Sequence, residues 1–280
     1  MSIMFLGTGN TLGGVYRVKS SIAVFAAGQI FLVDCGEGVI QRLLAAGILP
    51  NHINKIFFTH HHTDHNGGFI DFFITSSLNR LDSGRKLPIE VYGPTNSKEI
   101  ISKMRESVES DVISRKNNDN NWSKIFFHEL NNGIIYNEKG LEVTVFLVEH
   151  GPYKPAVGYK FEYNGKKIVF SGDTSPNKNV KFFSKKADIL IHEAYNTEWI
   201  KASVKQNPSD AQTMEAVMAK HTSTLEAAEI AQEAEVRHLV LTHHIPSPVP
   251  LARIEKQYLK GMSKIFSGKI SMGRDLMAIY

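Results

Sequence analysis

Four side chains of the metal-ligand type lie within one short segment of the chain. The segment, FFTHHHTDHNGG at residues 57–68, carries His60, His62, Asp64 and His65. His60 and His62 are two residues apart, so an extended backbone places both side chains on the same side. Imidazole and carboxylate ligands together suit zinc, and also iron or manganese. The segment therefore predicts a metal site.

The residues on either side of this segment indicate how it is held. A strand-like apolar run ends at Thr59, and a helix pattern containing Phe69 follows Gly67 and Gly68, which allow a tight turn. His61 alternates with the ligand candidates and should point away from them. A loop that is merely rich in histidine would not need a buried strand before it and a helix after it. An open catalytic metal site is the better interpretation.

Strand and helix patterns alternate along the whole chain. Strands are expected at residues 3–6, 21–26, 29–33, 55–59, 88–92, 142–148, 156–163, 167–170, 189–192 and 239–242. Helices are expected at residues 38–46, from 67 onward, at 97–109 and at 224–234. The pair Asn164-Gly165 predicts a β-hairpin. Strands with interleaved helices in both halves argue for a layered α/β architecture, and we expect residues 1–280 to form a single domain.

Composition and charge limit the classes of function. The 280 residues are 42% hydrophobic and 21% charged, so the chain can bury a core. A net charge of +4 permits an anionic substrate without demanding nucleic acid. The single cysteine, Cys35, ends an apolar run and is expected to be buried rather than catalytic. With no signal-peptide pattern and no membrane-length apolar run, a cytoplasmic protein without a membrane partner is expected.

The pattern H-x-H-x-D-H followed by two glycines resembles the metallo-β-lactamase fold superfamily. Further motifs follow in the order found in its ribonuclease Z and arylsulfatase-like branch, and extend the resemblance along nearly the whole chain: Gly7-Thr8-Gly9, Asp34-Cys35-Gly36-Glu37-Gly38, Ser171-Gly172-Asp173-Thr174, His192-Glu193-Ala194, His221-Thr222-Ser223 and Leu241-Thr242-His243. The resemblance implies an α/β fold of the αββα type, in which two β-sheets pack face to face with helices outside.

The resemblance also implies how two metal ions are shared among the ligands. One metal is held by His60, His62 and His150, the other by Asp64, His65 and His243, and Asp173 bridges them. His150, Asp173 and His243 each end or follow an apolar strand pattern. Buried strands that end at the same edge of the fold would bring these side chains close together. His244 is a rival for His243, which the Leu-Thr-His pattern favours. We expect two Zn²⁺ per chain, with Mn²⁺ or iron as alternatives.

Such a site implies hydrolysis by a metal-bound hydroxide, which Asp64 or Asp173 could orient. The leaving group then needs a proton or an equivalent stabilisation of its charge. By resemblance, Glu193 and His221 serve the leaving oxygen. The alternative for His221, which precedes a helix start, is a role in capping or packing. Asp64, Glu193 and His221 are therefore the candidate catalytic residues.

Other polar residues near the motifs receive plainer interpretations. Asp34 either orients a ligand histidine or is a simple turn residue. His192 is either a partner of the site or a satisfied buried histidine. Surface or loop positions are expected for the remaining histidines, His52, His128 and His238. The Asn-rich stretch at residues 110–123 is expected to be a polar loop.

The sequence is less informative about the substrate. Relatives that process tRNA usually carry a protruding arm between the positions of His150 and Asp173, which here are only 23 positions apart. The segment after His243 also differs, reading HIPSP, and Lys154 could meet an anionic group. The preferred hypothesis is a hydrolase of small anionic esters, either phosphodiesters or sulfate esters. Nucleic acid is a less favoured substrate.

Three alternatives remain open. They are a ribonuclease Z-type endonuclease that cuts tRNA 3′ ends, a lactone or thioester hydrolase, and a non-enzymatic protein that binds metal or nucleic acid. A complete ligand set together with Glu193 and His221 argues against the last. Since relatives in this branch often form homodimers, a homodimer is a further expectation, and the aromatic helix at Phe69 could supply its interface.

Overall fold

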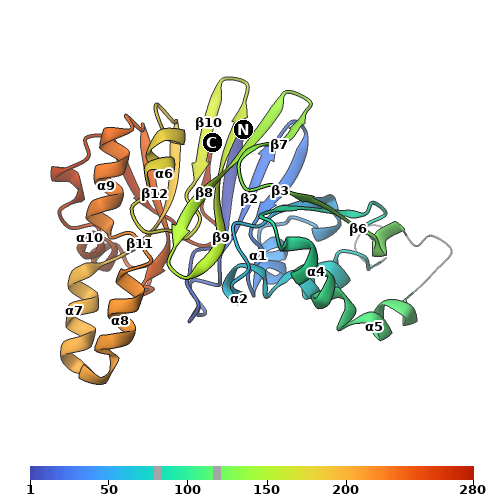
Figure 1. Cartoon of the computed structure of the whole chain (residues 1–280), viewed down its shortest axis with the longest axis horizontal. Helices are drawn as coiled ribbons and strands as arrows, with labels where there is room; N and C mark the ends of the chain where they lie inside the picture. Colours follow the sequence, from blue (N-terminus) through green and yellow to red (C-terminus); the bar gives the residue numbers. More distant parts are fainter. Residues whose placement is uncertain (79–83, 116–120) are drawn as a thin grey trace.

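Two β-sheets lie face to face, with helices on the outer side of each. The computed structural model describes residues 1–78, 84–115 and 121–280. In these ranges the strand orders are β14-β1-β2-β3-β4-β5-β6 and β13-β12-β11-β10-β9-β8-β7. Figure 1 shows helices α1, α2, α4 and α5 beside the first sheet and α6, α9 and α10 beside the second. The αββα prediction is confirmed.

The first half of the chain supplies most of the first sheet. Its strands are β1 (Ser2–Gly7), β2 (Ser21–Ala26), β3 (Gln29–Val33), β4 (Ile53–Phe57), β5 (Ile89–Gly93) and β6 (Ile125–Glu129), and the chain end adds β14 (Ala278–Ile279). Its helices are α1 (Val39–Ala45), α2 (Thr63–Asn66), α3 (Phe69–Thr75), α4 (Ser97–Glu106) and α5 (Glu109–Ser114).

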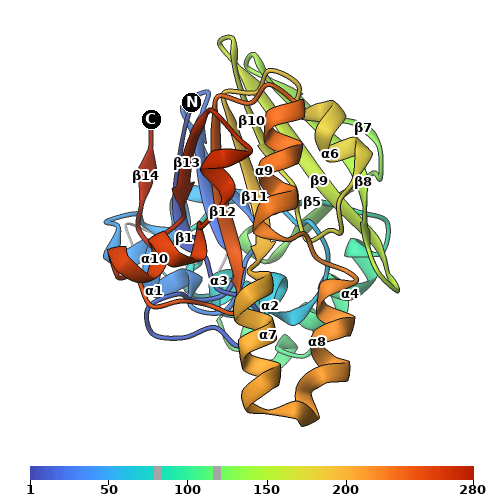
Figure 2. The ribbon, with the colours of Figure 1, turned by 90° about the vertical axis from the view of Figure 1, so that its left-hand side faces the viewer.

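The second half supplies the other sheet. Its strands are β7 (Gly133–Glu138), β8 (Leu141–His150), β9 (Tyr153–Tyr163), β10 (Lys166–Phe170), β11 (Ile189–Tyr195), β12 (His238–Ile245) and β13 (Lys269–Met272). Its helices are α6 (Lys178–Phe183), α7 (Thr197–Gln206), α8 (Ala211–Met218), α9 (Thr224–Glu233) and α10 (Ala252–Tyr258). In Figure 2, α7 and α8 project below the sheets as a helical hairpin. No helix in the described ranges is long and apolar enough to cross a bilayer.

Alternate residues of the strands fill three apolar layers. Phe57 of β4 points between the sheets, where its ring lies 4.6 Å from that of Tyr92 and 5.3 Å from that of Phe161 between centroids. Its neighbours Ile56 and Phe58 face the helices instead. Burying one such aromatic side chain contributes roughly 1.5–3 kcal/mol. Strand β4 is thus fixed from both faces, and so is the metal-ligand segment that follows it.

Two local predictions agree closely with the structure. The residues between β9 and β10 are Asn164 and Gly165, with φ of 50° and 72°, as a type I′ hairpin requires. Helix α9 begins at Thr224, where the helix expected at residues 224–234 begins. A capping box defines this start: the Ser223 hydroxyl accepts from the Glu226 N–H, and the Glu226 carboxylate accepts from the Ser223 N–H.

Other predictions were wrong in detail. His238 is buried and begins β12, where its Nε2 lies 2.9 Å from the Ser271 hydroxyl, so it is neither a surface nor a loop residue. His128, by contrast, is exposed, so its expected surface position is confirmed, although it belongs to a strand, β6. The stretch at 110–123 contains part of α5 and a 3₁₀ turn at Asn121–Ser123, while residues 116–120 lie outside the described ranges. The strand expected at 55–59 is β4, two residues earlier.

Candidate metal centre

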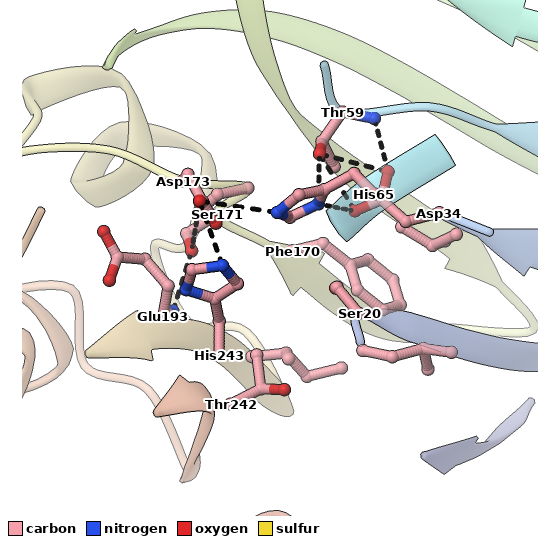
Figure 3. Close-up of a pocket in the computed structure, with 14 residues that line it drawn as sticks. Ser20, Asp34, Thr59, His65, Phe170, Ser171, Asp173, Glu193, Thr242 and His243 are labelled. Atoms are coloured by element: carbon pink, nitrogen blue, oxygen red, sulfur yellow. Dashed lines mark hydrogen bonds and ion pairs between the residues drawn. The ribbon is translucent and has the colours of Figure 1, made fainter. Parts of the chain in front are cut away.

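The ligand candidates meet at one rim of the two sheets. His60 and His62 follow β4, and His150 is the last residue of β8. Asp173 comes shortly after β10, and His243 lies within β12. Each residue is buried or nearly so. Figure 3 shows Asp173 between His65, which belongs to α2, and His243, which belongs to β12.

The first cluster contains three histidines. His62 Nδ1 lies 3.0 Å from His60 Nε2 and 3.2 Å from His150 Nε2. One nitrogen from each ring falls within 4.8 Å of the others, so a single ion could contact all three. His150 Nδ1 lies 3.1 Å from the Lys220 carbonyl oxygen, so Nδ1 carries the proton and donates it in a hydrogen bond. The lone pair of the ring is then on Nε2, which faces the cluster.

The second cluster contains Asp64, His65 and His243. Asp64 Oδ2 lies 3.1 Å from His243 Nε2 and 3.7 Å from His65 Nε2. Asp173 joins the two clusters, since its Oδ2 lies 3.2 Å from His243 Nε2, 3.4 Å from His65 Nε2 and 3.9–4.0 Å from the Nε2 atoms of His150 and His60. The predicted bridging residue thus lies between the two predicted triplets.

The donor set fits two divalent cations. Nitrogen lone pairs and carboxylate oxygens converge here in a buried region. Without a positive charge among them, burying these groups together would cost free energy. Within the described residues, His65 Nε2 is buried and has no hydrogen-bond partner, although it points into the cluster. Zinc takes nitrogen and carboxylate ligands of this kind, and manganese and iron also accept them.

The electrostatics of the metal-free site differ between the two ligand clusters. At His65 and His243 the charge of Asp173, with that of Asp64, outweighs the effect of burial and raises the pKa. Burial lowers the pKa of both His62 and His150 to about 4, so both rings are neutral at neutral pH. Burial alone would raise the pKa of Asp64, but nearby His65 and His243 hold it well below its usual range. The pKa of Asp173 is lowered in the same way, by His243 and then His65. Both carboxylates are therefore ionised.

Asp34 holds one of the candidate ligands in place. Its Oδ2 lies 2.7 Å from His65 Nδ1, and its Oδ1 accepts from the Thr59 N–H at 2.8 Å. The Thr59 hydroxyl adds a contact of 2.9 Å to Oδ2 (Figure 3). Asp34 itself has a φ of 61°, in the left-handed region that non-glycine residues seldom adopt. Of the two interpretations, the structure favours the orienting role over a simple turn residue.

Glu193 and His221 form a contact beside the clusters. His221 Nδ1 lies 2.9 Å from Glu193 Oε1, which also accepts from the backbone N–H groups of Thr174 and Thr222 at 3.1 and 3.2 Å. Burial, and then the charge of Asp173, raises the pKa of Glu193. Burial lowers the pKa of His221 to about 4. The other nitrogen of His221 is thus free to face the metal clusters.

The neighbouring candidates lie outside the clusters. His61 Nε2 contacts the Ser97 hydroxyl at 2.8 Å, and His244 Nε2 contacts the Gly273 carbonyl at 3.1 Å. His192 is fully buried, with Nδ1 2.7 Å from the Glu193 carbonyl, so it is a buried histidine satisfied at that nitrogen. Lys154 is exposed and lies 3.9 Å from Glu149. Cys35 is buried, as expected, and burial raises the pKa of its thiol.

Two residues of the site were not predicted from the sequence. The Thr11 hydroxyl donates to Asp64 Oδ2 at 3.0 Å, and the Tyr153 ring packs against His62 with centroids 4.2 Å apart. Neither residue belongs to a ligand pattern. Tyr153 lies only three positions after His150, in the segment that begins β9, and that closeness was the available signal.

The chain is similar to known proteins along most of its length. The family model described as Anti-Pycsar protein Apyc1 matches residues 1–206. Ribonuclease Z of Mycobacterium marinum is 31% identical over 279 residues, which cover 99% of this chain and 97% of that protein.

Two solved structures share the fold over their whole length. The metallo-β-lactamase fold protein YhfI of Bacillus subtilis has a TM-score of 0.74 at 17% identity, covering 99% of this chain and 98% of that one. The short form of human tRNase Z, ELAC1, has a TM-score of 0.72 at 25% identity, covering 100% and 99%.

Proposed function

We propose that this chain, which belongs to the Anti-Pycsar protein Apyc1 family and to the ribonuclease Z branch of the metallo-β-lactamase fold superfamily, hydrolyses small phosphodiesters. Membership makes it a metal-dependent hydrolase of ester bonds. The choice of a small substrate rests on the segment between His150 and Asp173. Strands β9 and β10 and their tight turn take up most of it, which leaves no room there for an arm that could grip a large RNA.

Two divalent ions would be held by the two ligand triplets, with Asp173 shared between them. When bound, they supply positive charge that activates water and stabilises the anionic ester. The remaining work falls to residues of the chain. Asp34 holds the orientation of the His65 ring through its hydrogen bond to Nδ1. The Tyr153 ring packs against His62 and covers one side of the site.

The leaving oxygen is assigned to His221. Glu193 Oε1 accepts a hydrogen bond from His221 Nδ1–H. This contact fixes the orientation of the ring and would stabilise a positive charge on it. Because a pKa of about 4 leaves the ring neutral in the metal-free protein, His221 must first take up a proton, and the attacking water has one to lose. The ring can then pass this proton to the oxygen that departs, as a general acid does. Because the ring also lies 4.9 Å from that of His150, measured between centroids, this proton would be delivered close to the metal clusters.

Cleavage of tRNA 3′ ends is the second candidate, and it is favoured by the 31% identity to a ribonuclease Z along nearly the whole chain. The hairpin of α7 and α8 is the structural feature that could contact a large substrate (Figure 2). Its residues 197–220 carry three lysines, Lys201, Lys205 and Lys220, and three acids, Glu198, Asp210 and Glu215. A balanced charge is poorly suited to binding RNA phosphates, so the small diester remains the preferred substrate.

A substrate panel tests the proposal. The metal-loaded protein is assayed with bis(p-nitrophenyl) phosphate, a 3′,5′-cyclic nucleotide, p-nitrophenyl sulfate, a lactone and a precursor tRNA, with Asp64→Ala as the inactive control. Turnover of the small diesters that is abolished in the variant supports the proposal. Efficient cutting of the tRNA alone would favour the endonuclease, and turnover of the sulfate or the lactone alone would overturn the choice of a phosphodiester.

A further inference from the structure

His61 lies between two candidate ligands yet faces away from the metal clusters. Its ring is buried and packs against Phe58, with ring centroids 5.1 Å apart. The ring and the backbone of His61 both have polar partners from other parts of the chain, namely Asn66, Ser97 and Tyr153. An ordinary buried residue at this position would need none of them.

The hydrogen bonds around the His61 ring define its proton positions. The Ser97 hydroxyl donates its single proton to the Pro94 carbonyl at 2.7 Å, so it can only accept from His61 Nε2 at 2.8 Å. His61 Nδ1 must then be an acceptor, and the Asn66 side-chain amide donates to it at 3.3 Å. Both ring nitrogens of a neutral imidazole are thereby satisfied.

The backbone of the same residue is held as well. The His61 N–H donates to the Tyr153 hydroxyl at 3.1 Å, and the Asn66 amide lies 3.4 Å from the His61 carbonyl. The anchors come from α2, α4 and β9, so three separate elements converge on one residue. Gly93 makes room for this arrangement, because a Cβ there would lie 2.3 Å from the Ser97 hydroxyl.

We propose that His61 is a positioning residue, which fixes the backbone between His60 and His62 so that both rings point at one metal. Adjacent residues of an extended chain point in opposite directions, so anchoring the His61 ring on one side sets the direction of the two ligand rings on the other. Groups that orient metal ligands typically change metal affinity by about 10–100-fold when removed. The inference rests on the proposed metal assignment of this site.

The test compares His61→Leu, which fills the space but donates nothing, with His61→Gln, whose amide can still donate towards Ser97. Zn²⁺ binding is measured by calorimetry on the metal-free proteins, and the visible spectrum of the Co²⁺ forms reports ligand geometry. In His61→Leu we expect the affinity for one of the two zinc ions to fall at least about tenfold and the Co²⁺ spectrum to change. His61→Gln should retain most of the zinc affinity.

Ser97→Ala is the second variant, since it removes only a hydroxyl and keeps the fold. It should weaken the same binding constant and lower kcat more than it changes KM. If the wild type binds two metals, and both His61→Leu and Ser97→Ala leave the zinc affinities and the Co²⁺ spectra unaltered, the inference is overturned. A wild type that binds no zinc would instead defeat the proposed function, so the two failures are distinguishable.

Discussion

The contact between His221 and Glu193 decides which proton transfer the site can perform. With Nδ1 bound to the carboxylate at 2.9 Å, only the other ring nitrogen can serve the reaction. General acid catalysis typically contributes 10²–10⁴-fold, and it matters most for a leaving group that is unstable as an anion.

His221→Gln should therefore lower kcat by roughly 10²–10⁴-fold for a diester with an alkoxide leaving group. The loss should be much smaller for bis(p-nitrophenyl) phosphate, because p-nitrophenolate departs without a proton. Steady-state kinetics on both substrates measure the difference, with zinc content as the control. Equal losses on the two substrates would show that His221 does not protonate the leaving group.

Asp34 offers a second prediction for a single residue. Asp34→Asn keeps the size of the side chain but presents an amide where Oδ2 now meets His65 Nδ1. Two donors would then face each other, and the His65 ring would have to rotate or change tautomer. We expect one metal affinity to fall by about 10–100-fold, as measured by competition with a chelator. Wild-type affinity for both metals would mean that Thr59 and the core orient His65 without Asp34.

Helices and strands differ in how far their local sequence determines where they begin and end. Helix α9 has its start defined by the capping box of Ser223 and Glu226, and its buried face packs on the second sheet. Ser223→Ala should destabilise the metal-free protein by about 0.5–2 kcal/mol, because the Glu226 N–H loses its acceptor. Urea unfolding measures this cost. Ser223→Thr, which keeps the hydroxyl, should cost less, and an equal loss in the two variants would argue against capping as the cause.

Strands with an apolar alternation were predicted from sequence, whereas exposed and polar ones were not. Strands β2 and β3 agree residue for residue because their residues are largely buried. Strands β6 and β7 were missed because most of their side chains are exposed or half-buried, which weakens the alternation. Helices α7 and α8 were also missed, since the turn at Asn207 and Pro208 resembles an ordinary loop. The hydrophobic pattern predicts an element only where that element touches the core.

The same limit applies to the site. Four ligand candidates could be predicted because they share one short segment, whereas His150, Asp173 and His243 were assigned through the resemblance to the superfamily. The support of His61 could not, since Ser97 and Tyr153 lie 36 and 92 positions away along the chain. Contacts of this kind depend on how α4 and β9 pack, and no local pattern encodes that packing.

At the scale of the whole molecule, metal binding should be coupled to stability. The two clusters join both sheets, so ions that bind only the folded chain stabilise it by mass action. At a thousandfold excess over the dissociation constant, each site should add about 4 kcal/mol. Thermal unfolding with zinc and with a chelator measures the effect. Asp173→Ala should lose most of the zinc-dependent rise in Tm, and a rise of wild-type size in that variant would contradict a shared ligand.

A buried ion pair ties the two sheets together independently of metal. Arg17, in the loop between β1 and β2, is 2% exposed, and its guanidinium lies 3.0 Å from Glu255 of α10. Arg17 Nε also donates to the Pro248 carbonyl at 2.8 Å. Removing one partner of a buried pair leaves an uncompensated charge, which typically costs about 3–5 kcal/mol.

Glu255→Leu should therefore destabilise the metal-free protein by about 3–5 kcal/mol in urea unfolding, because Arg17 stays charged within the core. Arg274 is the matched control, since it binds the same carboxylate from a side chain that is 46% exposed. Arg274→Leu should cost only about 0–1 kcal/mol, as exposed pairs do. Equal costs would place the strength of this connection in packing rather than in charge. The double variant Arg17→Leu/Glu255→Leu should then recover part of the loss, because no charge remains unpaired in the core.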